Sequence, residues 1–402
     1  MYHVMEASTC NFVQSAVILR FQIQLMVKIG NVELGEFPLL LAPMEDVSDP
    51  PFRKLCKEQG ADMVYTEFIS ADGLVHEAKR IFQKLEIFDY ERPVGIQYFG
   101  GQLENMIEAA GIIEAKQPNV IDINFGCPVA KVACRMAGAG LLRDVPQMVK
   151  LTEAVVKSTK YPVTVKTRLG WDDSSINILE VAERLQDVGI KALSIHARTR
   201  AQMYKGEANW EWIAKVKNNP RMHIPIFGNG DVDSPQKALD YKNRFGPDGI
   251  MIGRASIGYP WIFKEIKHYF TTGELLPAPD VHERVRAARQ HLRDSLDWKG
   301  EKLGVLEMRR HYAPYLRDLP HVKPYRARLV TEMDPAVLFD ILDEVEEVYS
   351  TYLKWRLPGL NYPSYSLTRT PRFTSAFSFG KSFNAFRLAF KLDCADFLRF
   401  SI

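Results

Sequence analysis

The chain has 402 residues, of which 46% are hydrophobic and 25% are charged. These are ordinary globular proportions, and they exclude a collagen-like, low-complexity or wholly disordered protein. The formal net charge of +3 is too small to indicate a nucleic-acid-binding protein unless basic residues cluster locally.

The cysteine pattern and the hydropathy of the chain indicate the cellular compartment of the protein. The 5 cysteines form neither an even set nor a CxxC pair, which indicates a reducing environment and argues against a structural zinc site. No uninterrupted apolar run reaches the roughly 20 residues that span a bilayer. The apolar segment 12–27 lacks the basic start and the cleavage site of a signal peptide. We therefore expect a cytoplasmic protein with no membrane span and no metal.

Short β-rich segments alternate with segments of helical periodicity from residue 37 onward. The expected strands are 38–42, 63–66, 94–98, 120–124, 163–166, 192–196, 224–228 and 249–252. Strict alternation of this kind predicts a parallel sheet. Eight units in about 230 residues match the count and length of a (β/α)₈ TIM barrel. A doubly wound sheet stays open as the alternative, because periodicity does not show closure.

The predicted barrel occupies residues 37–270, and the segments on either side differ from it. Residues 280–356 have helical periodicity, a basic first part and an acidic second part, and predict a smaller all-helical domain. Residues 1–36 carry no turn or capping signal; we interpret them as an extension or an incorrect start. Residues 365–402 form a Phe-rich tail to which we assign no role.

Polar side chains stand where the predicted strands end. In an α/β barrel the chemistry lies at the carboxyl ends of the strands. A purely structural barrel has no need of Lys, His, Gln and Asn at successive ends. The candidate residues there are Pro43, Met44, Gln97, Asn124, Cys127, Lys166, His196, Arg198, Asn229, Gly230, Asp231, Gly253 and Arg254.

The last two strand ends suggest a phosphate site. Glycines at 228, 230 and 253 let backbone N–H groups approach a phosphate closely, and Arg254 adds a charged donor. Barrels often hold phosphate in the loops after strands seven and eight. The residues there predict a phosphorylated cofactor.

Three further strand ends favour a flavin. A cation at Lys166 and a donor at His196 would stabilise the N1–O2 edge of a reduced isoalloxazine, and Gln97 suits the opposite edge. Cys127 lies on a Gly-Cys-Pro turn and is a buried small hydrophobe, an acid or a nucleophile. A thiol with a pKa of about 8.5 is protonated at neutral pH and can deliver a proton.

Several motifs together resemble the tRNA-dihydrouridine synthase family, over most of the chain. They are LAPM at 41–44, DPPFR at 49–53, NFGCP at 124–128 with Lys131, GAGLL at 138–142, VKTRLG at 165–170, IHARTR at 195–200, GNGD at 228–231 and GRAS at 253–256. DPPFR and EMRRH at 307–311 are most similar to the bacterial "B" type subgroup.

The resemblance implies an FMN-dependent barrel followed by a helical tRNA-binding domain. NADPH, or NADH, would reduce FMN, reduced FMN would pass a hydride to C6 of a uracil, and Cys127 would protonate C5. Asn124 would help hold the uracil. The implied cofactor-binding residues are Pro43, Met44, Gln97, Lys166, His196, Asn229, Gly230, Asp231, Gly253 and Arg254.

Holding a folded RNA requires phosphate contacts beyond the barrel mouth, because the reacting base must be flipped out. Basic residues for this lie at the expected rim and on the helical segment: Arg198, Arg200, Lys205, Arg309, Arg310, His311, Arg317, Lys323, Arg326 and Arg328. Of these, Arg198, Arg309 and Arg310 are the predicted substrate contacts, and we expect a monomer. Two alternatives stay open, namely an FMN barrel that reduces a free pyrimidine and an RNA-binding protein with a vestigial barrel.

Overall fold

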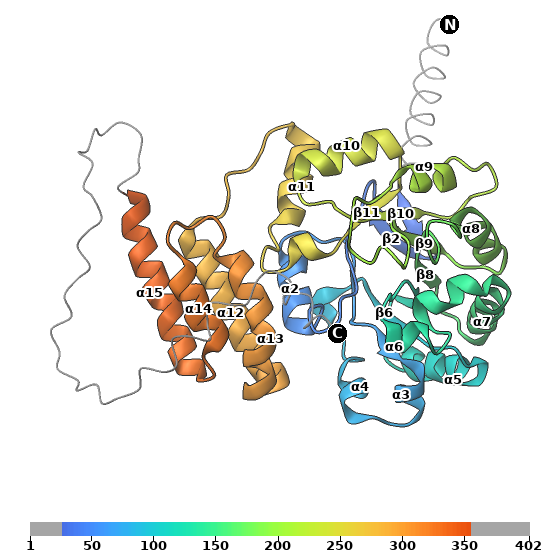
Figure 1. The fold of residues 1–402 in the computed structure, drawn as a ribbon, viewed down its shortest axis with the longest axis horizontal. Coiled ribbons are helices and arrows are strands. Elements are labelled where there is room, and N and C mark those ends of the chain that lie inside the picture. Colours follow the sequence, from blue (N-terminus) through green and yellow to red (C-terminus); the bar gives the residue numbers. More distant parts are fainter. Residues whose placement is uncertain (1–25, 355–402) are drawn as a thin grey trace, which may run out of the picture. The chain divides into compact units, whose positions relative to one another are not determined.

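The computed structural model describes residues 26–354, and its central element is a parallel barrel (Figure 1). Its eight strands follow the order β3-β11-β10-β9-β8-β7-β6-β4. Their bounds are β3 Leu39–Leu41, β4 Val64–Tyr65, β6 Val94–Phe99, β7 Val120–Phe125, β8 Val163–Arg168, β9 Ala192–His196, β10 Ile226–Asn229 and β11 Gly249–Ile252. All eight predicted strands are confirmed, each within a few residues.

Backbone hydrogen bonds between the first two barrel strands close the ring. The N–H of Leu41 donates to Met63 at 2.9 Å, and the N–H of Asp62 donates to Leu39 at 2.8 Å. The barrel prediction is therefore confirmed, and the doubly wound sheet is excluded.

The helices that follow the strands surround the barrel (Figure 1). The first begins where Asp49 accepts a hydrogen bond from the N–H of Phe52, and two prolines occupy its first turn, where a missing N–H costs nothing. The helices are α2 Pro50–Glu58, α3 Ala71–Val75, α4 Lys79–Gln83, α5 Leu103–Glu114, α6 Ala130–Ala133, α7 Val145–Ser158, α8 Ile178–Asp187, α9 Glu211–Lys217, α10 Pro235–Phe245 and α11 Ile262–Thr272. Short elements are β5 Ile69–Ser70, η1 Asp89–Glu91, η2 Gly138–Arg143 and η3 Arg254–Ser256.

A hairpin precedes the barrel and covers its amino-terminal end. Strands β1 (Val27–Ile29) and β2 (Val32–Gly35) pair antiparallel. Ile29 and Leu34 join one buried cluster with the barrel residues Leu40, Ala42, Met63, Tyr65, Val120, Ala192, Phe227 and Met251. The hairpin lies inside the segment expected to be an extension, of which residues 1–25 are outside the described part.

Up to residue 354, four helices follow the barrel: α12 Val281–Lys299, α13 Glu301–Tyr315, α14 Lys323–Thr331 and α15 Pro335–Lys354. The described residues up to Glu347 form one compact unit with the barrel. Lys299 pairs with the α2 cap Asp49 at 2.6 Å, and the buried ring of His311 accepts from the N–H of Gly258 at 3.2 Å. The boundaries 37–270 and 280–356 stay predictions, and the Phe-rich tail lies outside the described residues. Within residues 26–354, no helix is both long and apolar enough to cross a membrane.

Candidate active site

Four buried polar side chains inside the barrel form a hydrogen-bonded chain, which we call the amide network. It consists of Gln97 on β6, Asp122 and Asn124 on β7, and Thr164 on β8. The Asp122 carboxylate accepts from the Thr164 hydroxyl and, at 2.5 Å, from Nε2 of Gln97. Oε1 of Gln97 accepts from Nδ2 of Asn124 at 2.7 Å. Parallel pairing of the three strands places these side chains on the same face.

The amide network ends on the turn that carries Cys127. Oδ1 of Asn124 accepts from the N–H groups of Gly126 and Cys127, both at 2.8 Å. The Cys127 carbonyl in turn accepts from the N–H of Ala139 at 3.1 Å. Burial raises the pKa of the Cys127 thiol above its ordinary value. The side chain expected to donate a proton is therefore protonated at neutral pH and is held on a turn with hydrogen bonds on both sides.

Lys166 is partly buried at the barrel mouth, beside Asn229. Its Nζ donates to Oδ1 of Asn229 at 3.2 Å, and Nδ2 of Asn229 donates to the Met251 carbonyl at 2.8 Å. Burial, followed by the charge of Arg168, lowers the pKa of Lys166 to about 8. Lys166 thus carries most of its charge at neutral pH but loses it within reach of ordinary buffers.

His196 is buried at the end of β9 among positive charges. Burial and the charges of Arg168, Lys166, Arg198 and Arg254 hold the pKa of His196 well below its usual range, so its ring is neutral. We call those four residues the cationic cluster. The backbone of Gly230 has φ +125°, and a Cβ there would lie 3.2 Å from Cδ2 of His196. Glycine at 230 therefore leaves room for the ring.

Asp231 is the carboxylate that faces the cationic cluster. It accepts from Nη2 of Arg198 at 2.6 Å, from the N–H of Ala208 at 2.8 Å and from Nη2 of Arg254 at 3.1 Å. Burial opposes ionisation, but these hydrogen bonds hold the pKa of Asp231 below its ordinary value. The residue expected to bind cofactor thus also fixes the direction of Arg254.

Arg198 differs from the exposed rim residue that the sequence suggested. Its side chain is 2% exposed, and it donates to the carbonyls of Lys205 and Gly206 as well as to Asp231. Its Nη1 is buried and has no hydrogen-bond partner within residues 26–354. The loop after β9 folds over Arg198, and the side chain is therefore buried.

Arg168 and Asp122 are buried site residues that sequence reasoning did not single out. Arg168 donates from Nε to the Gly126 carbonyl at 2.8 Å, and from Nη1 to the carbonyls of Thr199 and Met203 at 3.1 and 2.9 Å. It therefore joins the loop after β7 to the loop after β9. The motif VKTRLG, which contains Arg168, was the sequence signal that could have identified Arg168 as a site residue.

The remaining cofactor candidates lie where the ends of β3 and β11 meet. A Cβ built on Gly253 would lie 3.6 Å from Sδ of Met44, with no steric conflict. Pro43 is buried, and the N–H of Met44 donates to the Ser48 hydroxyl at 2.8 Å. Gly228, expected to approach a phosphate, has another reason to be glycine: a Cβ there would lie 2.0 Å from the Trp210 ring.

Three acidic residues lie beside the mouth, in the loops after β3 and β4. Glu45, Asp46 and Glu67 have carboxylate oxygens within 4.8 Å of one another. Lys84 pairs with Glu45 and Glu67, and Arg310 of α13 donates to the Glu45 carbonyl at 3.2 Å and to Asp46 at 3.4 Å. Arg310 therefore joins the helical segment to the barrel mouth.

Several basic residues that we expected on an exposed RNA-binding face are hydrogen-bonded, ion-paired or buried within the protein. Arg309 donates to the Glu332 carbonyl at 3.3 Å, and Arg328 pairs with Glu344 at 2.5 Å. His311 is 3% exposed, and burial holds its pKa well below its usual range, so it adds no charge.

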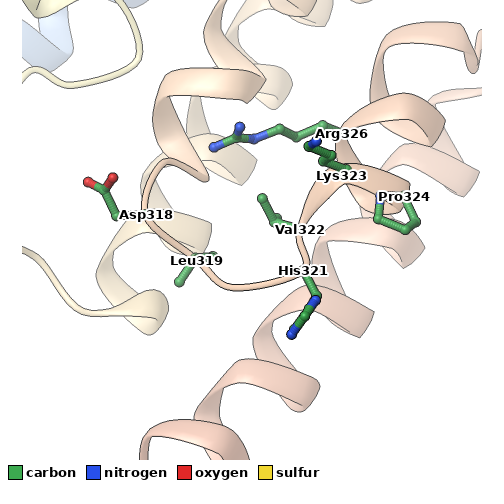
Figure 2. A pocket seen from close by; sticks show the side chains of 7 residues that line it. All are labelled: Asp318, Leu319, His321, Val322, Lys323, Pro324 and Arg326. Atoms are coloured by element: carbon green, nitrogen blue, oxygen red, sulfur yellow. The ribbon is translucent and has the colours of Figure 1, made fainter. Parts of the chain in front are cut away.

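Exposed basic groups do gather at the turn between α13 and α14. Figure 2 shows the side chains around a pocket of about 510 Å³ at this turn. The lining residues are Asp318, Leu319, His321, Val322, Lys323, Pro324 and Arg326. Arg326 donates to the Leu316 carbonyl at 2.6 Å, whereas Lys323 is exposed at the first turn of α14.

Comparison with known proteins adds a family context to this geometry. Residues 40–350 match the family model described as Dihydrouridine synthase (Dus). "Probable tRNA-dihydrouridine synthase 1" of Synechocystis sp. is 40% identical over 319 residues, covering 79% of this chain and 88% of that relative. "tRNA-dihydrouridine synthase B" of Pseudomonas putida is 42% identical over 303 residues, covering 75% and 89%. "Probable tRNA-dihydrouridine synthase" of Rickettsia prowazekii is 37% identical over 329 residues, covering 82% and 99%.

Proposed function

The chain belongs to the dihydrouridine synthase family, whose members are flavin-dependent oxidoreductases, and on this premise we propose its reaction in detail. It is a tRNA-dihydrouridine synthase that reduces the C5–C6 double bond of a uridine in tRNA. FMN is the proposed bound cofactor, and NADPH or NADH is the proposed reductant. We further propose that the enzyme is cytoplasmic and acts as a monomer.

The barrel residues fit a flavin that carries a phosphate. The cationic cluster holds four positive charges around a neutral His196, and Asp231 is the carboxylate bonded to two of them. The buried Nη1 of Arg198 also lacks a hydrogen-bond partner among the described residues. An anionic group would use this surplus of donors and charge. Arg254, Gly253 and Gly230 would hold the phosphate.

Side chains of the cationic cluster and of the amide network would hold the flavin ring. Lys166 and His196 would face its N1–O2 edge from β8 and β9, and Gln97 would face it from β6. Backbone groups at Pro43 and Met44 would contact the ring. When bound, the flavin supplies a hydride for C6 of the uracil.

Cys127 completes the reduction by giving a proton to C5, so that hydride and proton together convert the C5–C6 double bond into a single bond. Burial raises the pKa of the thiol, which keeps the proton on sulfur until transfer. Asn124 holds the turn that carries Cys127 and is the proposed uracil contact. The observation that carries this proposal is the buried Cys127 thiol on a hydrogen-bonded turn beside the cationic cluster.

The proposed tRNA contacts extend from the mouth to the helices. Arg310 joins both regions, Arg309 lies on the same helix, and the loop built on Arg198 borders the mouth. Lys323 and Arg326 at the pocket of Figure 2 add charge for phosphate groups. The reacting uridine must leave its stack to reach the barrel interior.

The test supplies purified, FMN-loaded protein with NADPH and tRNA from cells that lack dihydrouridine. Nucleoside mass spectrometry should find dihydrouridine, and mapping of the modified fragment should place it at one position. A flavoprotein that reduces free pyrimidines but leaves the tRNA unchanged, and binds it without salt dependence, would instead support the free-pyrimidine alternative.

A further inference from the structure

Asp122 is a buried carboxylate that the proposed reaction does not use. It is 1% exposed, lies on β7 two residues before Asn124, and accepts hydrogen bonds from Thr164 and Gln97. A lone carboxylate in a barrel interior is costly to bury unless it is hydrogen-bonded. Its place at the start of the amide network raises the question of what its charge does there.

The direction of each amide in this network is dictated from both ends. A carboxylate only accepts, so Gln97 must present its NH₂ group to Asp122 and its oxygen to Asn124. Backbone N–H groups only donate, so Asn124 must present its oxygen to Gly126 and Cys127 and its NH₂ group to Gln97. The two requirements agree, and the chain of hydrogen bonds runs in one direction.

We propose that Asp122 is a positioning residue: it fixes the direction of the Gln97 and Asn124 amides and, through them, the backbone turn that presents Cys127. This inference rests on the proposed function for its consequence in catalysis, but the positioning itself is a property of the folded chain. Without the carboxylate, the Gln97 amide has no acceptor for its NH₂ group and can rotate. Asn124 then faces a donor, and when its amide turns to accept from that donor, its oxygen leaves both N–H groups of the turn.

The charge on Asp122 is compatible with this role. Burial raises the pKa of Asp122 to about 6, while the hydrogen bonds from Thr164 and Gln97 and the charge of Lys166 act in the opposite direction. The carboxyl is therefore ionised at neutral pH and accepts from both neighbours.

The experiment follows the reactivity of the Cys127 thiol in the full-length protein. Iodoacetamide is the probe, and the rate is read by mass spectrometry on the peptide that contains Cys127, so that the other cysteines do not interfere. In Asp122→Ala the rate should rise about tenfold, which corresponds to ~1.4 kcal/mol of lost ordering of the turn. The kcat for tRNA reduction should fall at least as much, with KM for tRNA within about twofold.

A charge-swapped variant separates positioning from general damage. In the double variant D122N/Q97E the introduced amide donates to the introduced carboxylate, whose other oxygen accepts from Asn124. This restores the direction of Asn124, so the alkylation rate of Cys127 should return to within about twofold of wild type. Because Gln97 is also a proposed flavin contact, the alkylation rates of all variants are compared at equal flavin content.

Asp248→Ala is the matched control. Its carboxylate accepts from the N–H of Ile226 at 2.8 Å at the opposite end of the strands, far along the chain from the turn. The alkylation rate of Cys127 should stay at the wild-type value. The proposal is overturned if Asp122→Ala leaves the rate unchanged, if Asp248→Ala raises it equally, or if the double variant is not rescued. If wild-type protein makes no dihydrouridine, the proposed function fails while the alkylation rates still decide the role of Asp122.

Discussion

The two sides of the barrel mouth differ in how their polar and charged side chains are paired. On the side of β6 and β7, the amide network pairs its carboxylate and amide groups with partners inside the protein. On the side of β8 to β11, the cationic cluster gathers four positive charges, and its carboxylate partner is Asp231. Hydrogen bonds to fixed partners hold a side chain in place, whereas a surplus of positive charge favours the binding of an anionic ligand. The first side is suited to aim a reacting group and the second to bind an anionic cofactor.

The largest effect is expected for the reacting group on the amide-network side. Cys127→Ala should lower dihydrouridine formation by about 10²- to 10⁴-fold, because a positioned acid contributes that much. Flavin content, read by absorbance, should stay at the wild-type level, since the thiol supplies none of the charged donors of the cationic cluster.

Cys134→Ala is the control, because Cys134 is exposed at the end of α6. Its activity should equal that of wild type. Unchanged dihydrouridine formation in Cys127→Ala would remove the thiol from the mechanism.

On the cationic side, Arg254→Ala should weaken FMN binding by about 10- to 100-fold, in line with the loss of a charged hydrogen bond. Titration of apoprotein with FMN by fluorescence quenching measures this. Arg244→Ala, at an exposed arginine that pairs with Glu211 at 3.4 Å on the outside of the barrel, should bind FMN normally. Equal loss in both variants would contradict a specific phosphate contact.

The pKa of Lys166 gives a smaller, pH-dependent effect on the same side. Its pKa is lowered from 10.5 to about 8, so the charge is present below pH 8 and is lost as the pH rises through that value. FMN affinity should therefore fall by up to about tenfold between pH 7 and 9, since one proton controls the charge. Lys166→Arg should remove this decline, because the guanidinium stays charged. A decline that persists in Lys166→Arg would assign the titration to another group.

We expect the smallest effect for a substitution on the helical segment, away from the barrel mouth. Lys323→Ala should weaken tRNA binding about threefold to tenfold and reduce the salt dependence of binding by about one charge. Filter binding at several salt concentrations measures both quantities. Lys157→Ala, at an exposed lysine on α7 that pairs with Glu153, should leave both unchanged. The same loss in both variants would indicate a non-specific effect of charge.

The strands and the strand-end residues could be predicted because their signals are local. Buried parallel strands read as short β-branched runs, and each is followed by the polar residues that the loops present. Lys166, His196 and Cys127 are therefore recognisable as site candidates from the amino-acid sequence alone. The hairpin β1–β2 was missed because its few apolar residues become informative only when Ile29 and Leu34 meet the barrel core.

The roles of the buried charges could not be predicted, because they depend on partners far along the chain. Asp122 sits inside the apolar run VIDINF, and its function depends on Gln97 and Thr164 from two other strands. Arg198 looked like an exposed cation, but the loop that covers it is folded by contacts with Asp231. A sequence indicates that a charge is present, whereas its burial is set by tertiary packing.

The single guanidinium of Arg168 has a consequence for attempts to redesign this enzyme. It binds carbonyl groups of two loops at once, at Gly126 and at Thr199 and Met203. Exchanging one of these loops for that of a relative changes the anchor point of the other, so specificity cannot be transplanted loop by loop. A successful graft has to carry both loops and the strand that bears Arg168 as one cassette.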